Sequence, residues 1–424
     1  MQAMTGDRYD LISWDPLGAF WKGTVLHPGI EAPIDFSNQT NVDEFMELAI
    51  PAGRVLQGLK EKCQHQTRTT LSYVGTTATV RDLVSIHDAI EEPEAKLNFW
   101  GFSYGTLIGQ YFVNMFPERV GRVALEGVVD PEYWANKPPH ESWSITATHI
   151  DEMLEKFAIA CSKSSSCCLA ENRESDTEIL AQLQNLITSA YEYKKGNGTS
   201  TLISSGAIRH AILRDLPYPS QWRGLARQLC KIHDQLGQDK TSLLNQFAPQ
   251  DFLRHSLPNS RAKMPHDEPP HYSFQAITCA DAADSVGVNT TTVFQELARV
   301  AAQISPKFGP AWGEGGLYCH EWPYRAVERY SGPWNVSFPN SEPLLIIGSA
   351  LDSVTPFKSA EKVARLFGEK AVLVKQEAHG HVASWDQEHR QSQCTFSIVQ
   401  NYFVDGILPE SGVTCEADQT NPFA

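Results

Sequence analysis

Ser103 stands in a sequence pattern that predicts a nucleophilic serine. It lies in GFSYG, residues 101–105, which has the G-x-S-x-G form of a nucleophile elbow. In such an elbow the serine occupies a sharp turn between a strand and a helix, and its hydroxyl stands above the end of the sheet. The flanking Gly101 and Gly105 are expected to be needed because larger side chains would collide with the helix packed below. The pattern therefore predicts acyl transfer through Ser103.

The residues around the elbow separate this interpretation from an ordinary tight turn of small residues. A short apolar run at 97–100 precedes it, and apolar residues at helical spacing follow it. The first N–H of that helix, on Tyr104, would then point to the place where negative charge develops during acyl transfer. We expect Tyr104 to supply an oxyanion-hole donor.

A serine hydroxyl is a weak nucleophile unless a base takes its proton and an acid orients that base. GSALDSVTP (348–356) places Asp352 in a turn just after an apolar run, where the acid is expected. QEAHGHVAS (376–384) offers two bases, His379 and His381, and composition does not separate them. An H-x-H pair also occurs at metal sites, but no third ligand accompanies it at a suitable spacing, so we expect neither a metal nor a cofactor.

The order of elements around Ser103 predicts a parallel sheet. Helical spacing over 81–90, an apolar run at 97–100, the helix after Ser103 and a second apolar run at 120–125 form a helix–strand–helix–strand series. Consecutive parallel strands joined by a helix require a right-handed crossover. The apolar run YDLISW (9–14) is expected to be a further buried strand.

The middle of the chain interrupts this alternation. Amphipathic helical windows such as 179–187 and 293–304 occur there, with no clear strands, and the strand–helix pattern resumes at 343–347. The sequence predicts a hydrolase core at 1–131 that carries the elbow. A helical cap follows at 132–340, and a second part of the core at 341–424 carries the acid and the histidine.

Charge and hydropathy exclude some classes of partner. The chain has 35 Lys and Arg against 50 Asp and Glu, a net charge of −15, and no basic stripe that could bind phosphates. No apolar run approaches the length of about 18 residues that spans a bilayer. We expect a peptide or small-molecule substrate, no nucleic acid and no membrane span.

Cysteine usage favours an oxidising compartment. The chain has nine cysteines; Cys161, Cys167 and Cys168 cluster, and none of the spacings resembles a zinc site, so disulfides are predicted. The odd number leaves at least one outside an internal bridge. Glycosylation sequons point to secretion too and stand at Asn38, Asn197, Asn289 and Asn335. Because the first residues do not resemble a signal peptide, a cytoplasmic location is the alternative.

Several longer stretches resemble the peptidase family that contains the proline iminopeptidases and tripeptidyl aminopeptidases, in fungal form. The resemblance covers nearly the whole chain and rests on YDLISWDPLG (9–18), the segment 100–131 around the elbow, CHEWP (319–323), PLLIIGSALDSVTP (343–356), the Gly380–His381 pair and the closing segment 393–416. It implies an α/β-hydrolase fold, a mostly parallel sheet with a large inserted helical cap, and cleavage near a free peptide N-terminus with the cap selecting the substrate.

The resemblance also assigns residues. Because the histidine of such proteins directly follows a glycine, it selects His381 over His379. It implies bridges between Cys279 and Cys319 and between Cys394 and Cys415.

Two departures from the family pattern affect the expectation. Relatives have further strands and a glycine-rich loop with a second oxyanion donor before the segment that corresponds to YDLISW, so the N-terminal strands are expected to be missing here and turnover to be low. Relatives usually carry arginine at the position of Leu17.

Three functions agree with the sequence. The first is a serine aminopeptidase that works through an acyl-enzyme. The second keeps the same Ser103, Asp352 and His381 but acts on esters or thioesters of a small secondary metabolite. The third is a truncated, non-catalytic homologue.

Overall fold

The computed structural model describes most of the chain. It covers residues 5–14, 30–66, 71–92, 94–172, 174–197, 204–237, 273–313, 316–338, 341–382, 385–386, 389–390, 392–418 and 421–423. Leu17 lies outside the described residues.

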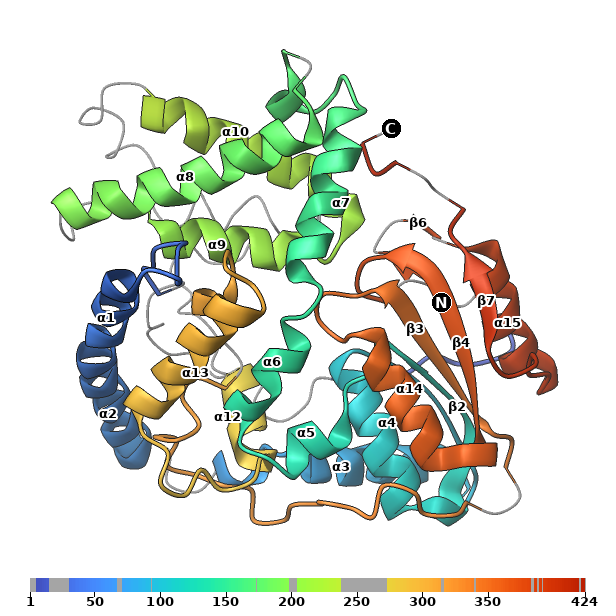
Figure 1. The fold of residues 1–424 in the computed structure, drawn as a ribbon. Helices are drawn as coiled ribbons and strands as arrows, with labels where there is room; N and C mark the ends of the chain where they lie inside the picture. The colour runs from blue at the N-terminus through green and yellow to red at the C-terminus, as the bar shows by residue number, and fades with distance from the viewer. Residues whose placement is uncertain are drawn as a thin grey trace.

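A parallel five-stranded sheet forms the centre of the core (Figure 1). Its order is β1-β2-β3-β4-β7, and the strands are β1 (Leu97–Phe102), β2 (Val120–Glu126), β3 (Leu344–Leu351), β4 (Ala371–His379) and β7 (Val413–Glu416). Two very short strands, β5 (Trp385–Asp386) and β6 (His389–Arg390), form a separate antiparallel pair. The predicted parallel sheet is confirmed.

Helices cover both faces of this sheet and build a second layer beside it (Figure 1). They are α1 (Gln39–Glu47), α2 (Ala49–Gln66), α3 (Thr76–Ile90), α4 (Tyr104–Met115), α5 (Pro131–Ala135), α6 (Trp143–Thr146), α7 (Ile150–Ser162), α8 (Asp176–Asn197), α9 (Ser205–Asp215), α10 (Trp222–Gly237), α12 (Ser273–Asp281), α13 (Thr290–Gln303), α14 (Phe357–Phe367) and α15 (Gln393–Asp405).

Alternation along β3 shows how the two faces are buried. Leu344 and Ile346 join the apolar cluster formed with α3, α4 and α14, whereas Leu345 and Ile347 join the cluster formed with α15. Successive side chains of a strand point to opposite faces, so a continuous apolar run is needed when helices cover both. All four of these side chains are fully buried.

The helical layer has its own apolar cores. One lies among α7, α8, α9 and α10, and a second joins α1 to α13 through the rings of Phe45 and Phe294, whose centroids are 5.2 Å apart. Figure 1 shows α1 and α2 beside α13, although they precede β1 in the chain. The helical layer therefore includes residues from before the sheet, and the division at residues 131 and 340 stays a proposal.

The strand predicted at 9–14 is wrong. None of these residues pairs with a strand in the part of the chain that the structure describes, and Leu11 and Ile12 are 47% and 55% exposed. The segment is held by Tyr9, whose hydroxyl donates to the Phe403 carbonyl at 2.6 Å. An apolar run forms a buried strand only where a neighbouring strand has unpaired backbone N–H and C=O groups to bond with it. Here the Tyr9 side chain, rather than the backbone, connects the segment to the core.

Four disulfides join segments of the described chain. The expected bridges Cys279–Cys319 and Cys394–Cys415 are confirmed, and the predicted use of the cysteine cluster appears as Cys161–Cys167 and Cys168–Cys230. The buried Cys63 takes no part in a disulfide. None of the helices that the structure describes is long and apolar enough to cross a membrane.

Candidate active site

Ser103 lies in the strand–turn–helix geometry that its motif predicts. β1 ends at Phe102 and α4 begins at Tyr104, so Ser103 alone forms the turn, with φ 51° and ψ −119°. This conformation is strained for a residue with a Cβ. The backbone holds it because the Ser103 N–H donates to the Glu126 carbonyl at 3.0 Å and the Thr106 N–H donates to the Ser103 carbonyl at 2.9 Å.

The two flanking glycines differ in why they are present. A Cβ on Gly101 would lie 2.3 Å from the Gly105 carbonyl oxygen, so the turn requires glycine at 101. A Cβ on Gly105 would meet no atom of the described residues within 4 Å. The collision expected at Gly105 is therefore wrong for the residues that the structure describes.

Tyr104 is the first residue of α4, and its side chain contacts Thr76. Its N–H is at the start of α4, where the first N–H groups have no acceptor within the helix and the helix dipole is positive. Its hydroxyl is 2.9 Å from Thr76 Oγ1. Burial raises the pKa of this hydroxyl, which stays protonated.

Asp352 and His381 form a buried hydrogen-bonded pair. Asp352 directly follows β3, and its Oδ2 is 2.8 Å from His381 Nδ1. Its Oδ1 accepts the N–H groups of Val354 at 2.7 Å and Thr355 at 2.8 Å, so the turn fixes the carboxylate. A carboxylate only accepts hydrogen bonds, which assigns the proton of the neutral imidazole to Nδ1 and leaves Nε2 as an acceptor.

Thr355 contacts both members of this pair. No role was predicted for it from the sequence. Its hydroxyl donates to Asp352 Oδ2 at 2.8 Å and lies 3.2 Å from His381 Nδ1. It therefore fixes the same carboxylate oxygen that orients the imidazole. A signal was present, since Thr355 lies in the turn that carries the acid.

The end of β2 connects Ser103 with His381. The Glu126 carbonyl accepts the Ser103 N–H, and a Cβ on the next residue, Gly127, would lie 3.0 Å from His381 Cε1. His381 Nε2 is buried and has no hydrogen-bond partner in the described part of the chain. Catalytic hydrogen bonds often tighten only when a substrate binds, so this geometry is compatible with transfer of a proton from Ser103.

His379 occupies a different environment. It is the last residue of β4, pairs with Leu351 in the sheet and is exposed, whereas His381 is buried against Asp352. The structure thus brings Asp352 together with His381 and not with His379.

A buried carboxylate, Asp281, is linked to Tyr104 through Thr76 and was not predicted from the sequence. Asp281, at the end of α12, accepts the Thr76 N–H at 2.8 Å, the Thr76 hydroxyl at 2.5 Å and the Trp134 Nε1–H at 2.9 Å. Burial raises its pKa to about 6, against the lowering effect of these hydrogen bonds. Thr76 also contacts the Tyr104 hydroxyl, so Asp281 joins α12 to the elbow. The separation of 205 residues between Asp281 and Thr76 leaves no local signal.

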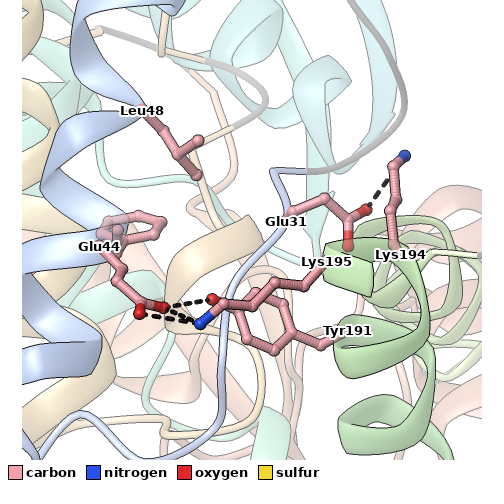
Figure 2. A pocket seen from close by; sticks show the side chains of 7 residues that line it. Glu31, Glu44, Leu48, Tyr191, Lys194 and Lys195 are labelled. Carbon is pink, nitrogen blue, oxygen red and sulfur yellow. Dashed lines mark hydrogen bonds and ion pairs between the residues drawn. The ribbon is translucent and has the colours of Figure 1, made fainter. Parts of the chain in front are cut away.

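A pocket of about 280 Å³ lies elsewhere, between α1 and α8 (Figure 2). Its charged side chains are paired, with Lys195 2.7 Å from Glu44 and Lys194 3.7 Å from Glu31. Its lining consists of Glu31, Glu44, Phe45, Leu48, Tyr191, Lys194 and Lys195. This set contains no nucleophile–base pair for acyl transfer. No group of three metal-ligating side chains occurs within the ranges that the structure covers.

Comparisons with known proteins agree with this geometry. Residues 305–415 match the family described as TAP-like protein. Over 419 residues, which are 96% of this chain and 75% of the relative, it is 25% identical to the serine protease Hip1 of Mycobacterium tuberculosis. It is 24% identical over 430 residues to the tripeptidyl aminopeptidase of Streptomyces lividans, covering 99% of this chain and 72% of that protein.

A third relative has an esterase name. The carboxylesterase B of Mycobacterium tuberculosis is 24% identical over 417 residues, 96% of this chain and 74% of its own. With the parallel sheet and the strand–turn–helix at Ser103, these matches show that the chain has the α/β-hydrolase fold.

We predict that Asp281 makes stability depend on pH. Its pKa rises from 3.8 in the unfolded chain to about 6 in the fold, so its contribution is fully present below pH 3.8 and is lost as the pH rises through 6. The difference corresponds to about 3 kcal/mol. Denaturant unfolding between pH 4 and pH 7 should therefore show the wild type losing stability relative to Asp281→Asn.

The matched control is Asp284→Asn, which removes an exposed carboxylate that Arg329 contacts at 3.0 Å. Hydrogen bonding to Arg329 lowers the pKa of Asp284, so its contribution has the opposite sign and is lost as the pH falls. Parallel pH curves for the wild type and Asp281→Asn would contradict the assignment to Asp281.

Proposed function

We propose that this protein is a serine hydrolase with Ser103 as the nucleophile, His381 as the general base and Asp352 as the residue that orients the base. The observation that carries the proposal is the buried contact of 2.8 Å between Asp352 Oδ2 and His381 Nδ1, together with the strained Ser103 at a strand–helix turn. The relatives named as a serine protease and a tripeptidyl aminopeptidase support the serine hydrolase class.

The proposed reaction begins with a proton transfer. His381 Nε2 accepts the proton of the Ser103 hydroxyl while Oγ attacks the substrate carbonyl, and the oxygen of that carbonyl becomes negative. The Tyr104 N–H donates a hydrogen bond to this oxyanion. Asp352 balances the charge of the imidazolium and keeps its ring oriented, with Thr355 holding the carboxylate in place.

Collapse of this tetrahedral intermediate completes the first half of the reaction. The imidazolium gives its proton to the leaving group, and an acyl-enzyme forms on Ser103. Water then attacks the acyl carbon as His381 takes its proton, a second tetrahedral intermediate breaks down, and the acid product leaves. Ser103 regains its proton from His381.

We propose an aminopeptidase activity that releases residues or short peptides from a free peptide N-terminus. The tripeptidyl aminopeptidase relative supports it, and the net charge of −15 attracts a protonated amino terminus. The second candidate is an esterase, favoured by the relative named carboxylesterase B. Both use the same serine chemistry, so the substrate-binding residues of the helical layer decide between them.

An exported location accompanies this proposal. The four disulfides are consistent with an oxidising compartment. The side chains of Asn38, Asn289 and Asn335 are exposed, as carriers of glycans must be. We propose these three sequons as glycosylation sites.

A matched set of chromogenic substrates tests the proposed function. Aminoacyl and tripeptidyl p-nitroanilides with a free amine should be hydrolysed with kcat/KM at least about tenfold above that of their N-acetylated forms, because a positive charge is lost on acetylation. Ser103→Ala is the control for contaminating activity. Hydrolysis of p-nitrophenyl esters alone would favour the esterase, and inactivity on every substrate would favour the non-catalytic homologue.

The two histidines provide a prediction about the base. His381→Ala should lower kcat by about a thousandfold or more, because the variant loses the group that contacts Asp352. His379→Ala is its matched control and should lower kcat by at most about tenfold. Kinetics on the best substrate measure both, and the reverse ranking would move the base to His379.

A further inference from the structure

The connection between α9 and α10 lies directly on the loop that carries His381. We call residues 217–219, Pro217 to Pro219, the strap. The His381 N–H donates to the Pro217 carbonyl at 2.8 Å, while the preceding Gly380 N–H donates to the Leu351 carbonyl at 2.9 Å. Two successive N–H groups are thus held from different sides, one by the helical layer and one by the sheet.

The strap packs so closely against Gly380 that no side chain fits at this position. Its φ is +117°, which side chains rarely adopt, and a Cβ there would lie 2.7 Å from Pro219 Cδ and 3.0 Å from the Pro217 carbonyl oxygen. The space beside Gly380 is therefore filled by the strap. This gives a physical reason for the Gly380–His381 pair, because the residue before the base must admit another backbone.

The strap also touches the imidazole itself. The Tyr218 ring lies edge-on to the His381 ring, with centroids 6.2 Å apart and planes at 67°. The same imidazole is bounded near Cε1 by Gly127 and held at Nδ1 by Asp352. Together with Gly127, Asp352 and Thr355, Tyr218 therefore limits the rotation of the ring.

The strap is itself fixed within the helical layer. The Trp222 indole is fully buried and donates to the Leu216 carbonyl at 2.8 Å, and the Tyr218 N–H donates to the Asp215 carbonyl at 3.0 Å. Proline at 217 and 219 restricts the backbone further. A shift of α9 or α10 would therefore move the strap, and with it the Gly380–His381 loop that the strap contacts.

We infer that Tyr218 is a positioning residue and that, through the strap, the helical layer holds the His381 ring in the orientation that Asp352 gives it. This inference rests on the proposed role of His381 as the base. A base must be held to within about 0.5 Å and 10–20° for efficient proton transfer, and a displacement of about 1 Å costs up to a hundredfold in rate. A substrate that shifts α9 or α10 would thereby also alter the position of the base.

Kinetics with a small and a large substrate distinguish positioning from substrate binding. Tyr218→Ala should lower kcat about tenfold on both p-nitrophenyl acetate and a free-amine anilide, with KM changed less than about threefold, because the base is misplaced for every substrate. Tyr218→Phe keeps the ring and should stay within about twofold of the wild type. Tyr191→Ala, which removes a tyrosine of α8 that lines the pocket of Figure 2, is the matched control and should not change kcat.

Gly380→Ala tests the approach of the strap directly. It should lower kcat at least about tenfold, because the new Cβ must push the strap away from the loop. The midpoint of thermal unfolding of each variant checks its fold. If Gly380→Ala does not fold, the comparison of Tyr218→Ala with Tyr218→Phe tests whether the strap positions His381.

The outcomes separate the inference from the proposed function. If Tyr218→Ala raises only the KM for the anilide and leaves kcat on p-nitrophenyl acetate intact, the strap lines the substrate site and does not position His381. An active wild type with unaffected Tyr218 variants overturns this inference alone. A wild type that hydrolyses neither substrate overturns the proposed function and this inference with it.

Discussion

The buried hydrogen bond between Asp352 and His381 is the interaction on which the proposed chemistry depends. Both groups are buried, so the carboxylate needs hydrogen-bond donors from the protein itself. It receives two backbone N–H groups of its own turn, the Thr355 hydroxyl and the imidazole. This set of contacts makes Asp352 a fixed point, and the imidazole takes its orientation from it.

The parallel sheet explains why residues far apart in sequence meet there. Strands β1, β2, β3 and β4 lie side by side in this order, and the residues that follow their carboxyl ends are Ser103, Gly127, Asp352 and, two positions beyond β4, His381. Parallel strands bring their carboxyl ends to one edge of a sheet. The helical layer contributes through Asp281, which is joined to the elbow by Thr76, and through the strap.

Short sequence patterns predicted those parts of the site that are formed by residues close together in the chain. The turn at Ser103, the acid after β3 and the strands β1, β2 and β3 follow from residue type and spacing within a few positions. Asp281 and the strap depend on contacts across long separations, such as the 205 residues between Asp281 and Thr76, which no periodicity records. The error at 9–14 has a related cause, because an apolar run does not say whether a neighbouring strand is available to pair with it.

Covalent labelling with a serine-directed fluorophosphonate tests the central claim most directly, since it needs no knowledge of the substrate. Ser103 should carry the adduct, identified by the mass of its proteolytic peptide, and Asp352→Asn and His381→Ala should slow labelling at least about a hundredfold. The same adduct at another serine, or equal labelling rates in all three proteins, would contradict the account.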